Sequence, residues 1–234
     1  MAKKKRHATV ERKSAIVRAS FVKVLGDTKD FNKTEDGRVK YTMMCLIPKS
    51  VDSIGVNLTD DRKKQLLKEG KAFYKALKAD AVEVAERAFP DDDPADYADA
   101  VLKDGDKINT KKRKKDAKPL APGYFYFNVS TMSQPSVMRP KAADGAITDS
   151  DADELFSGCW VRIFYNVYSY DHPENSGVSI GLGNIKKCYE DERLGGGTGA
   201  KFDDEDDVEE LEPDDKDFDD APEGKAEEDD EDWD

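Results

Sequence analysis

The chain has 234 residues, of which 38% are charged and 37% hydrophobic, and its formal net charge is −13 at pH 7. Its three cysteines, Cys45, Cys159 and Cys188, are odd in number and widely spaced, which argues against a disulfide framework and favours a reducing compartment. No apolar run approaches the roughly 20 residues that span a bilayer, and no apolar stretch follows the basic N-terminal residues. We therefore expect a soluble cytoplasmic protein rather than a membrane or secreted one.

The charge is distributed unevenly along the chain. Residues 201–234 hold 21 acidic residues and three lysines, a net charge of −18, which leaves +5 for residues 1–200. Dense like charge with little apolar content cannot repay the entropy of ordering, so we expect residues 201–234 to form a disordered acidic tail. Residues 195–200 are rich in glycine and predict a hinge before that tail.

The first predicted elements are an arm, two strands and a helix. Residues 1–13 are polar and basic and predict a flexible arm. Residues 14–25 and 38–47 are rich in β-branched and apolar residues, and each predicts a strand. Thr59 is a suitable N-cap, and apolar residues then recur at helical spacing, so we expect one long helix over about 60–89.

The second half of the chain predicts loops and three further strands. Residues 91–99 indicate an acidic linker, and residues 104–118 a basic, turn-rich loop. Residues 123–131, 158–170 and 177–189 each combine apolar and aromatic residues in a pattern typical of strands.

This order of elements predicts a mainly β (α+β) fold with an inserted helix. Five strands and one helix fit a small, partly open antiparallel barrel like the oligonucleotide-binding (OB) fold, with one domain over residues 14–194. A β-sandwich fits the pattern nearly as well.

Residues 158–170 carry the most informative pattern. Strict alternation directs one apolar set toward the core, namely Cys159, Val161, Ile163, Tyr165 and Val167. The opposite set contains Trp160, Arg162, Phe164, Asn166, Tyr168 and Tyr170. Rings stack on bases of any sequence at about 1–3 kcal/mol each, and a guanidinium binds phosphate or stacks. We therefore predict a nucleic-acid-stacking surface formed by Trp160, Arg162, Phe164 and Tyr168.

Residues 123–131 repeat this pattern, with Tyr124 and Tyr126 predicted to face outward and to stack as well. The alternative is that both aromatic strands are buried on both faces, with the helix covering the second face. A basic run and an arginine further along the chain are predicted to hold phosphates, although the run also fits a solvated loop or a nuclear-import-like basic run. These residues are Lys111, Lys112, Arg113, Lys114, Lys115 and Arg139.

The acidic tail contains aromatic residues that a purely solubilising segment does not need. Phe218 and Trp233 are candidate anchors for a partner pocket ringed by basic residues. A tethered polyanion also competes for a basic groove at high effective concentration. We hypothesise that the tail inhibits nucleic-acid binding and docks partner proteins.

Two segments resemble a known family. Residues 123–140 (GYFYFNVSTMSQPSVMRP) and 154–197, which include SGCWVRIFYNVYSY, GVSIGLGNI and LGGG, are similar to bacteriophage single-stranded DNA-binding proteins. The overall plan resembles those of short-tailed phages: an OB barrel, an inserted helix and an acidic tail. The resemblance implies a role in phage replication and recombination in the host cytoplasm, with a tail that contacts the replicative DNA polymerase and the primase–helicase. One departure is that Asp234 follows the last aromatic residue, Trp233.

We expect no enzymatic activity, cofactor or metal, and the sequence leaves a homodimer open. One rival interpretation is a metal-dependent nuclease that uses scattered carboxylates such as Asp91–Asp93 and Asp151. The other rival is an acidic DNA mimic or a chaperone-like interaction protein.

Overall fold

The computed structural model describes residues 7–26, 33–34, 37–55, 58–107, 119–140, 145–172 and 175–194. The chain divides into two units, residues 1–196 and 197–234, and every described residue belongs to the first. The predictions of a hinge and a disordered tail therefore lie outside the described residues.

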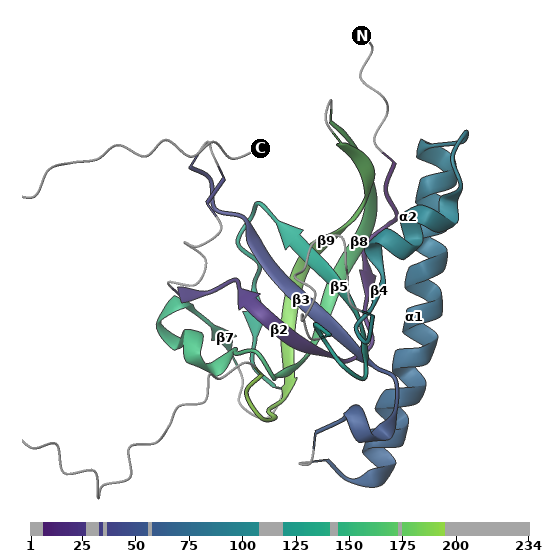
Figure 1. The fold of residues 1–234 in the computed structure, drawn as a ribbon. Helices are drawn as coiled ribbons and strands as arrows, with labels where there is room; N and C mark the ends of the chain where they lie inside the picture. The colour runs from purple at the N-terminus through teal and green to yellow at the C-terminus, as the bar shows by residue number, and fades with distance from the viewer. Residues whose placement is uncertain are drawn as a thin grey trace, which may run out of the picture. The chain divides into compact units, whose positions relative to one another are not determined.

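Strands dominate the described unit (Figure 1). In chain order the elements are β1 (Arg12–Lys13), β2 (Val17–Lys23), β3 (Tyr41–Pro48), η2 (Val51–Ser53), α1 (Asp60–Ala88), α2 (Pro94–Val101), β4 (Lys103–Asp104), β5 (Tyr124–Thr131), β6 (Val137–Met138), β7 (Ala146–Ile147), η3 (Asp149–Glu154), β8 (Trp160–His172) and β9 (Asn175–Tyr189). The five predicted strands correspond to β2, β3, β5, β8 and β9 and are confirmed.

These five strands form one ring rather than two stacked sheets. Hydrogen bonds join β8, β2, β3, β5 and β9 in that order, and β9 pairs again with β8. The β2–β8 and β5–β9 junctions consist of only two residue pairs each, so the ring is not closed into a complete barrel. A partly open, OB-like barrel is therefore confirmed. Most strand pairings are antiparallel as expected, whereas β9 runs parallel to β5 and β6.

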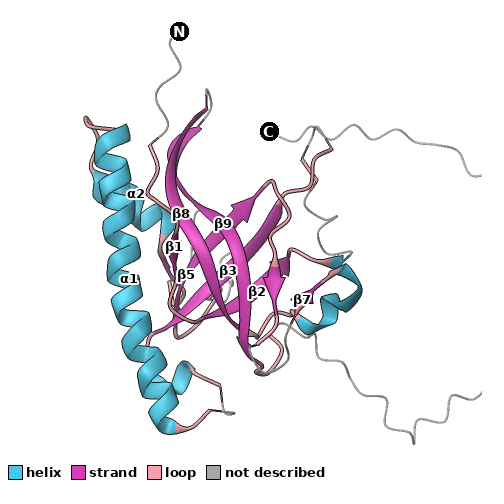
Figure 2. Ribbon diagram, turned by 180° about the vertical axis from the view of Figure 1, so that it is seen from behind, coloured by secondary structure: helices cyan, strands magenta, loops and turns pink. Residues whose placement is uncertain are grey.

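The core lies inside the ring and is covered by α1. The predicted inward residues of β8, from Cys159 to Val167, are all buried. Phe73 of α1 packs edge-to-face on Phe127 and Tyr165, with ring centroids 5.8 Å and 5.5 Å apart. Both views show α1 lying along one side of the strands (Figure 2). The apolar stripe of α1 therefore completes the core, where burying one large apolar side chain contributes about 1.5–3 kcal/mol.

The two helices have clear start signals. Thr59 accepts a hydrogen bond from the backbone nitrogen of Arg62 at 3.4 Å, and the long helix is confirmed. The expected acidic linker is wrong, because it contains α2. Asp93 caps that helix through the backbone nitrogen of Ala95 at 2.9 Å, and Pro94 follows at the position where proline is best tolerated. Within the described residues, neither helix has the length and apolar composition that a membrane crossing requires.

The described part of the N-terminal arm runs beside β8 and contains the short edge strand β1 and an isolated bridge at Ala8. The backbone nitrogens of Thr9 and Ser14 donate to the carbonyls of Val167 and Ile163, both at 2.9 Å. Residues 7–13 are therefore hydrogen-bonded to β8, whereas residues 1–6 of the predicted arm lie outside the described residues. The reason is that β2 pairs with only the first two residues of β8. The backbone groups of β8 beyond them need another partner.

Candidate nucleic-acid interface

The outward side chains of β8 form a row that we call the platform, defined as Arg162, Phe164, Asn166, Tyr168 and Tyr170. Phe164 is 42% exposed, and the other members are half-buried. At about 3.3 Å per residue, the platform spans about 26 Å along the strand. Arg162, Phe164 and Tyr168 therefore lie on the outer surface as expected, and their contact with nucleic acid stays a prediction.

Glycines of β9 make room for the platform. A Cβ atom at Gly181 would lie 2.2 Å from the side-chain oxygen of Asn166. A Cβ atom at Gly183 would lie 3.0 Å from the Cβ of Phe164 and 2.5 Å from a carboxylate oxygen of Glu11. Only glycine allows such close approach. The side chains of Phe164 and Asn166 therefore lie over β9, which has no side chain at Gly181 or Gly183.

A groove of about 480 Å³ lies at the Arg162 end of the platform. We call it the basic groove. Five cationic residues line it, and one of them, Lys187, is only 3% exposed and pairs with Glu190. The other four, whose charges are more accessible, are Lys13, Arg62, Arg162 and Lys186. Its lining also includes Met138, Phe164, Cys188 and Tyr189. Cations and rings on one concave surface form the combination that a single-stranded nucleic acid requires.

Three of these cations were not predicted from the sequence. Lys13 is in β1, Arg62 is in the first turn of α1, and Lys186 pairs with Arg162 across β8 and β9. Arg62 also lies over the ring of Tyr189, 5.2 Å from its centroid. Only the alternation of β9 could have indicated Lys186, because tertiary packing alone brings the other two to the groove.

Arg162, one of the cations of the basic groove, forms an ion pair. A guanidinium nitrogen of Arg162 lies 3.6 Å from a carboxylate oxygen of Glu69, and the two side chains are 31% and 35% exposed. Such a solvent-accessible pair contributes only about 0–1 kcal/mol. A phosphate can therefore compete with Glu69 for this arginine.

Trp160 is not part of the platform, and the prediction that it faces solvent is wrong. Its side chain is fully buried and packs with Ile16, Ile54 and Leu66. Its indole nitrogen donates to a carboxylate oxygen of Asp191 at 2.8 Å. Alternation places Trp160 on the outer face, but the beginning of α1 and the residue Ile54 cover that face at this end of β8.

Tyr124 and Tyr126 also lie apart from the platform. Tyr124 is only 7% exposed, its hydroxyl donates to the carbonyl of Ser53, and Arg18 donates to it at 3.1 Å. Its predicted solvent exposure is therefore wrong. Tyr126 is half-buried and lines a different pocket of about 470 Å³, together with Lys103 and other residues of α1, α2 and β5.

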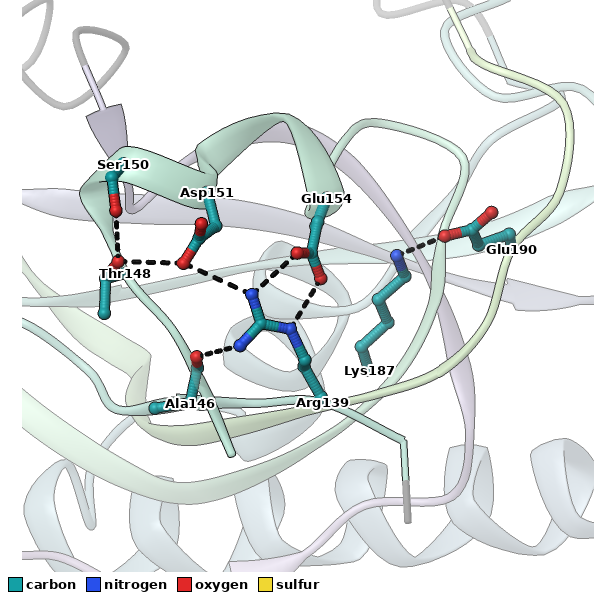
Figure 3. A network of polar contacts seen from close by, with 8 residues as sticks. All are labelled: Arg139, Ala146, Thr148, Ser150, Asp151, Glu154, Lys187 and Glu190. Carbon is teal, nitrogen blue, oxygen red and sulfur yellow. Dashed lines mark hydrogen bonds and ion pairs between the residues drawn. The ribbon is translucent and has the colours of Figure 1, made fainter. Parts of the chain in front are cut away.

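Arg139 holds together a network within the protein (Figure 3). Its guanidinium donates to both carboxylate oxygens of Glu154, at 2.9 and 2.6 Å, and pairs with Asp151 at 3.2 Å. It also donates to the carbonyl of Ala146. The guanidinium lowers the pKa of Glu154, and contributes to the lowered pKa of Asp151 after the hydrogen bond from Thr148. The predicted phosphate-binding role of Arg139 therefore conflicts with its position, since its donors already have partners.

The remaining predicted site residues belong to the basic run and the acidic tail. The basic run Lys111–Lys115 and the tail residues Phe218 and Trp233 lie outside the described residues. Lys107, four positions before the run, is the last described residue on that side.

Three of the four carboxylates named in the rival nuclease interpretation, those of Asp92, Asp93 and Asp151, have partners within the protein. Asp92 accepts a hydrogen bond from Tyr97 at 2.6 Å, Asp93 caps α2, and Asp151 pairs with Arg139. In the part of the chain that the structure describes, no three His, Cys, Asp or Glu side chains are grouped so that they could hold a metal ion. These acids therefore act within the fold.

Known proteins resemble this chain in sequence and in fold. A family model described as "Enterobacter phage Enc34, ssDNA-binding protein" matches residues 10–218, which is most of the chain. The chain belongs to this family. The resemblance inferred from the sequence to bacteriophage single-stranded DNA-binding proteins is thereby confirmed. None of the curated proteins compared with the chain matches it significantly.

Solved structures of a member of this family have a similar fold. The single-stranded DNA-binding protein from bacteriophage Enc34 aligns with a TM-score of 0.56 and 18% identity, over 80% of this chain and 86% of that chain. The same phage protein in complex with ssDNA aligns with a TM-score of 0.51 and 19% identity, over 79% and 89%. Its C-terminal truncation aligns with a TM-score of 0.53 and 17% identity, over 79% and 87%. At these identities, the likeness supports the fold alone.

Proposed function

We propose that this protein binds single-stranded DNA with little sequence preference, through the platform and the basic groove. The observation that carries the proposal is that the exposed ring of Phe164 and the guanidinium of Arg162 lie together in a groove with three further accessible cations. The family's description as a ssDNA-binding protein supports the same function.

The two parts of the surface have different tasks in this proposal. Phe164 and Tyr168 stack on bases, and each such ring contributes about 1–3 kcal/mol regardless of sequence. Arg162, Lys186, Arg62 and Lys13 hold phosphates. Each phosphate neutralised on a single strand contributes about −0.7 to the slope of log affinity against log salt concentration, so these four cations together give about −3.

Titration of labelled oligo-dT at two salt concentrations tests these assignments. Phe164→Ala should weaken binding by about five-fold or more at both concentrations, because stacking depends little on salt. Lys186→Gln should make the salt slope shallower by about 0.7. Lys75→Gln is the matched control, because Lys75 is exposed on α1 and does not line the groove. Wild-type affinity for Phe164→Ala would contradict the proposed site.

The acidic tail is proposed to compete with DNA for the same cations. Its net charge of −18 is complementary to the basic groove, and its covalent attachment keeps its effective concentration high. A chain that ends at Ala200 should bind oligo-dT more tightly than the full chain at low salt, and the difference should shrink as salt screens the tail. Equal affinities at low salt would refute self-inhibition.

A second proposed role of the tail is to dock replication proteins during phage replication and recombination. Phe218 and Trp233 provide apolar anchors among acidic residues, and the family resemblance points to a polymerase and a primase–helicase as partners. Binding of the phage's own polymerase should be lost when both aromatic residues are replaced by alanine. Oligo-dT binding, which is proposed for residues 1–200, should persist in the same variant. Retained polymerase binding would contradict this role.

A further inference from the structure

Phe21 of β2 combines an exposed ring with an unusual backbone. The residue is 57% exposed, and its φ angle is 47°. In the described ranges of the chain, it is the one residue other than glycine with a positive φ. A bulky L-residue is strained in this region, and such strain concentrates at functional sites.

A β-bulge places the ring at the surface. Val17 and Ala19 of β2 are fully buried, so simple alternation would direct Phe21 into the core as well. The pairing of β2 with β3 instead shifts between Ser20 and Lys23. Bulges redirect side chains at functional sites, and this one turns an apolar ring toward solvent at a cost in backbone strain.

The strand register connects the bulge to the platform. Paired residues on neighbouring strands share a face of the sheet. One row of pairs runs around the outside of the ring, and its members are Lys23, Thr42, Ser130, Gly181 and Asn166. Asn166 belongs to the platform, and Lys23 lies two residues after Phe21. With strands about 4.8 Å apart, the row is about 19 Å long.

The chemistry of this row favours a nucleic acid over a protein partner. Its members are small or polar, and all are half-buried. A protein partner's anchor is usually surrounded by other apolar groups in the centre of an interface. A single ring at the end of a polar row, next to a lysine, instead fits a base that stacks and a phosphate that follows it.

We propose that Phe21 is a second base-stacking position, reached by a DNA strand that leaves the platform and crosses β9, β5 and β3. This inference rests on the proposed function. It adds the path of the bound DNA across the protein and the position, Phe21, where that path ends. A short oligonucleotide occupies the platform alone, and a longer one reaches Phe21 as well.

The test compares oligo-dT of about 4 and about 16 nucleotides, the range of site sizes in single OB folds. Phe21→Asn removes the ring, and asparagine tolerates a positive φ, so the variant should unfold at a temperature no lower than that of the full wild-type chain. It should bind the long oligonucleotide about five-fold or more weakly, and the short one unchanged. Phe21→Tyr, which keeps a ring, should bind both like the wild type.

Phe164→Ala separates this inference from the proposed function. That variant should weaken binding of both lengths, because every oligonucleotide contacts the platform. If Phe164→Ala weakens both and Phe21→Asn weakens neither, the second position is overturned and the proposed function stands. If Phe21→Asn weakens both lengths equally, the path from the platform is overturned. If Phe164→Ala has no effect, the proposed function itself fails.

Discussion

Replacing Arg12 by glutamine removes the cation that faces a buried carboxylate. Arg12 of β1 lies 2.8 Å from Asp80 of α1, and their side chains are 44% and 4% exposed. Exposed ion pairs contribute about 0–1 kcal/mol, and loss of one partner of a fully buried pair costs about 3–5 kcal/mol. Since this pair is half-exposed, Arg12→Gln should lower the free energy of unfolding by about 2 kcal/mol.

The loss should depend on pH. Burial raises the pKa of Asp80 above its ordinary value, and Arg12 opposes that rise. Without Arg12 the pKa rises further, so Asp80 binds a proton in the folded state at a pH where it is ionised in the unfolded state. Folded stability of Arg12→Gln therefore falls as pH rises through this window, and the difference from wild type should be smaller at about pH 5 than at about pH 7.

Urea unfolding at the two pH values measures this difference, and a double-mutant cycle with Asp80→Asn isolates the pair. In the Asp80→Asn background, the loss of Arg12 should cost much less and should not vary with pH. An equal cost at both pH values, or in both backgrounds, would show that Arg12 acts through packing instead of charge.

Three further predictions concern the groove and the network beside it. Glu69→Gln releases Arg162 from its ion pair and should raise the affinity for oligo-dT, measured by fluorescence anisotropy, by up to about five-fold at low salt. A fall in affinity would show instead that Glu69 holds the arginine in the orientation that binds DNA. Cys188 lines the groove, and burial raises the pKa of its thiol, so alkylation of this thiol should be slow. Bound oligo-dT should slow the alkylation further. If DNA binds elsewhere, oligo-dT should leave the alkylation rate unchanged. Arg139→Ala should leave oligo-dT affinity unchanged but lower the unfolding temperature at neutral pH. Because the pKa of Glu154 is lowered in the folded state, the difference in unfolding temperature between wild type and variant should disappear as pH falls through that lowered pKa. A weakened affinity of the variant for oligo-dT would instead favour a phosphate contact by Arg139.

Local patterns were sufficient for much of the fold. Alternation in β8 identified the buried set that includes Ile163 and Val167, because a strand with one face on a core must alternate. The spacing of apolar residues and the cap at Thr59 located α1. The helix α2 was missed, although Asp93 and Pro94 are strong start signals, because its acidic composition indicated a linker.

The candidate site could be predicted only in part, because alternation does not say what lies above a face. Arg162 and Phe164 are uncovered, whereas Trp160, two residues earlier, lies beneath Ile54 and Leu66. The other cations of the groove come from β1, α1 and β9, and no spacing along the chain connects these segments. The ion pairs of Arg139 could not be foreseen, because a sequence shows a charge and not its partners.

The edge strand at the N-terminus has a practical consequence for anyone who purifies this protein. The backbone nitrogen of Ser169, between the two tyrosines of the platform, donates to the carbonyl of His7 at 2.8 Å. A fusion peptide placed before Met1 is therefore tethered only a few residues from the surface that we propose to bind DNA. A polyhistidine leader at that end would add imidazoles close to the measurement, so affinities should be determined after the leader has been cleaved.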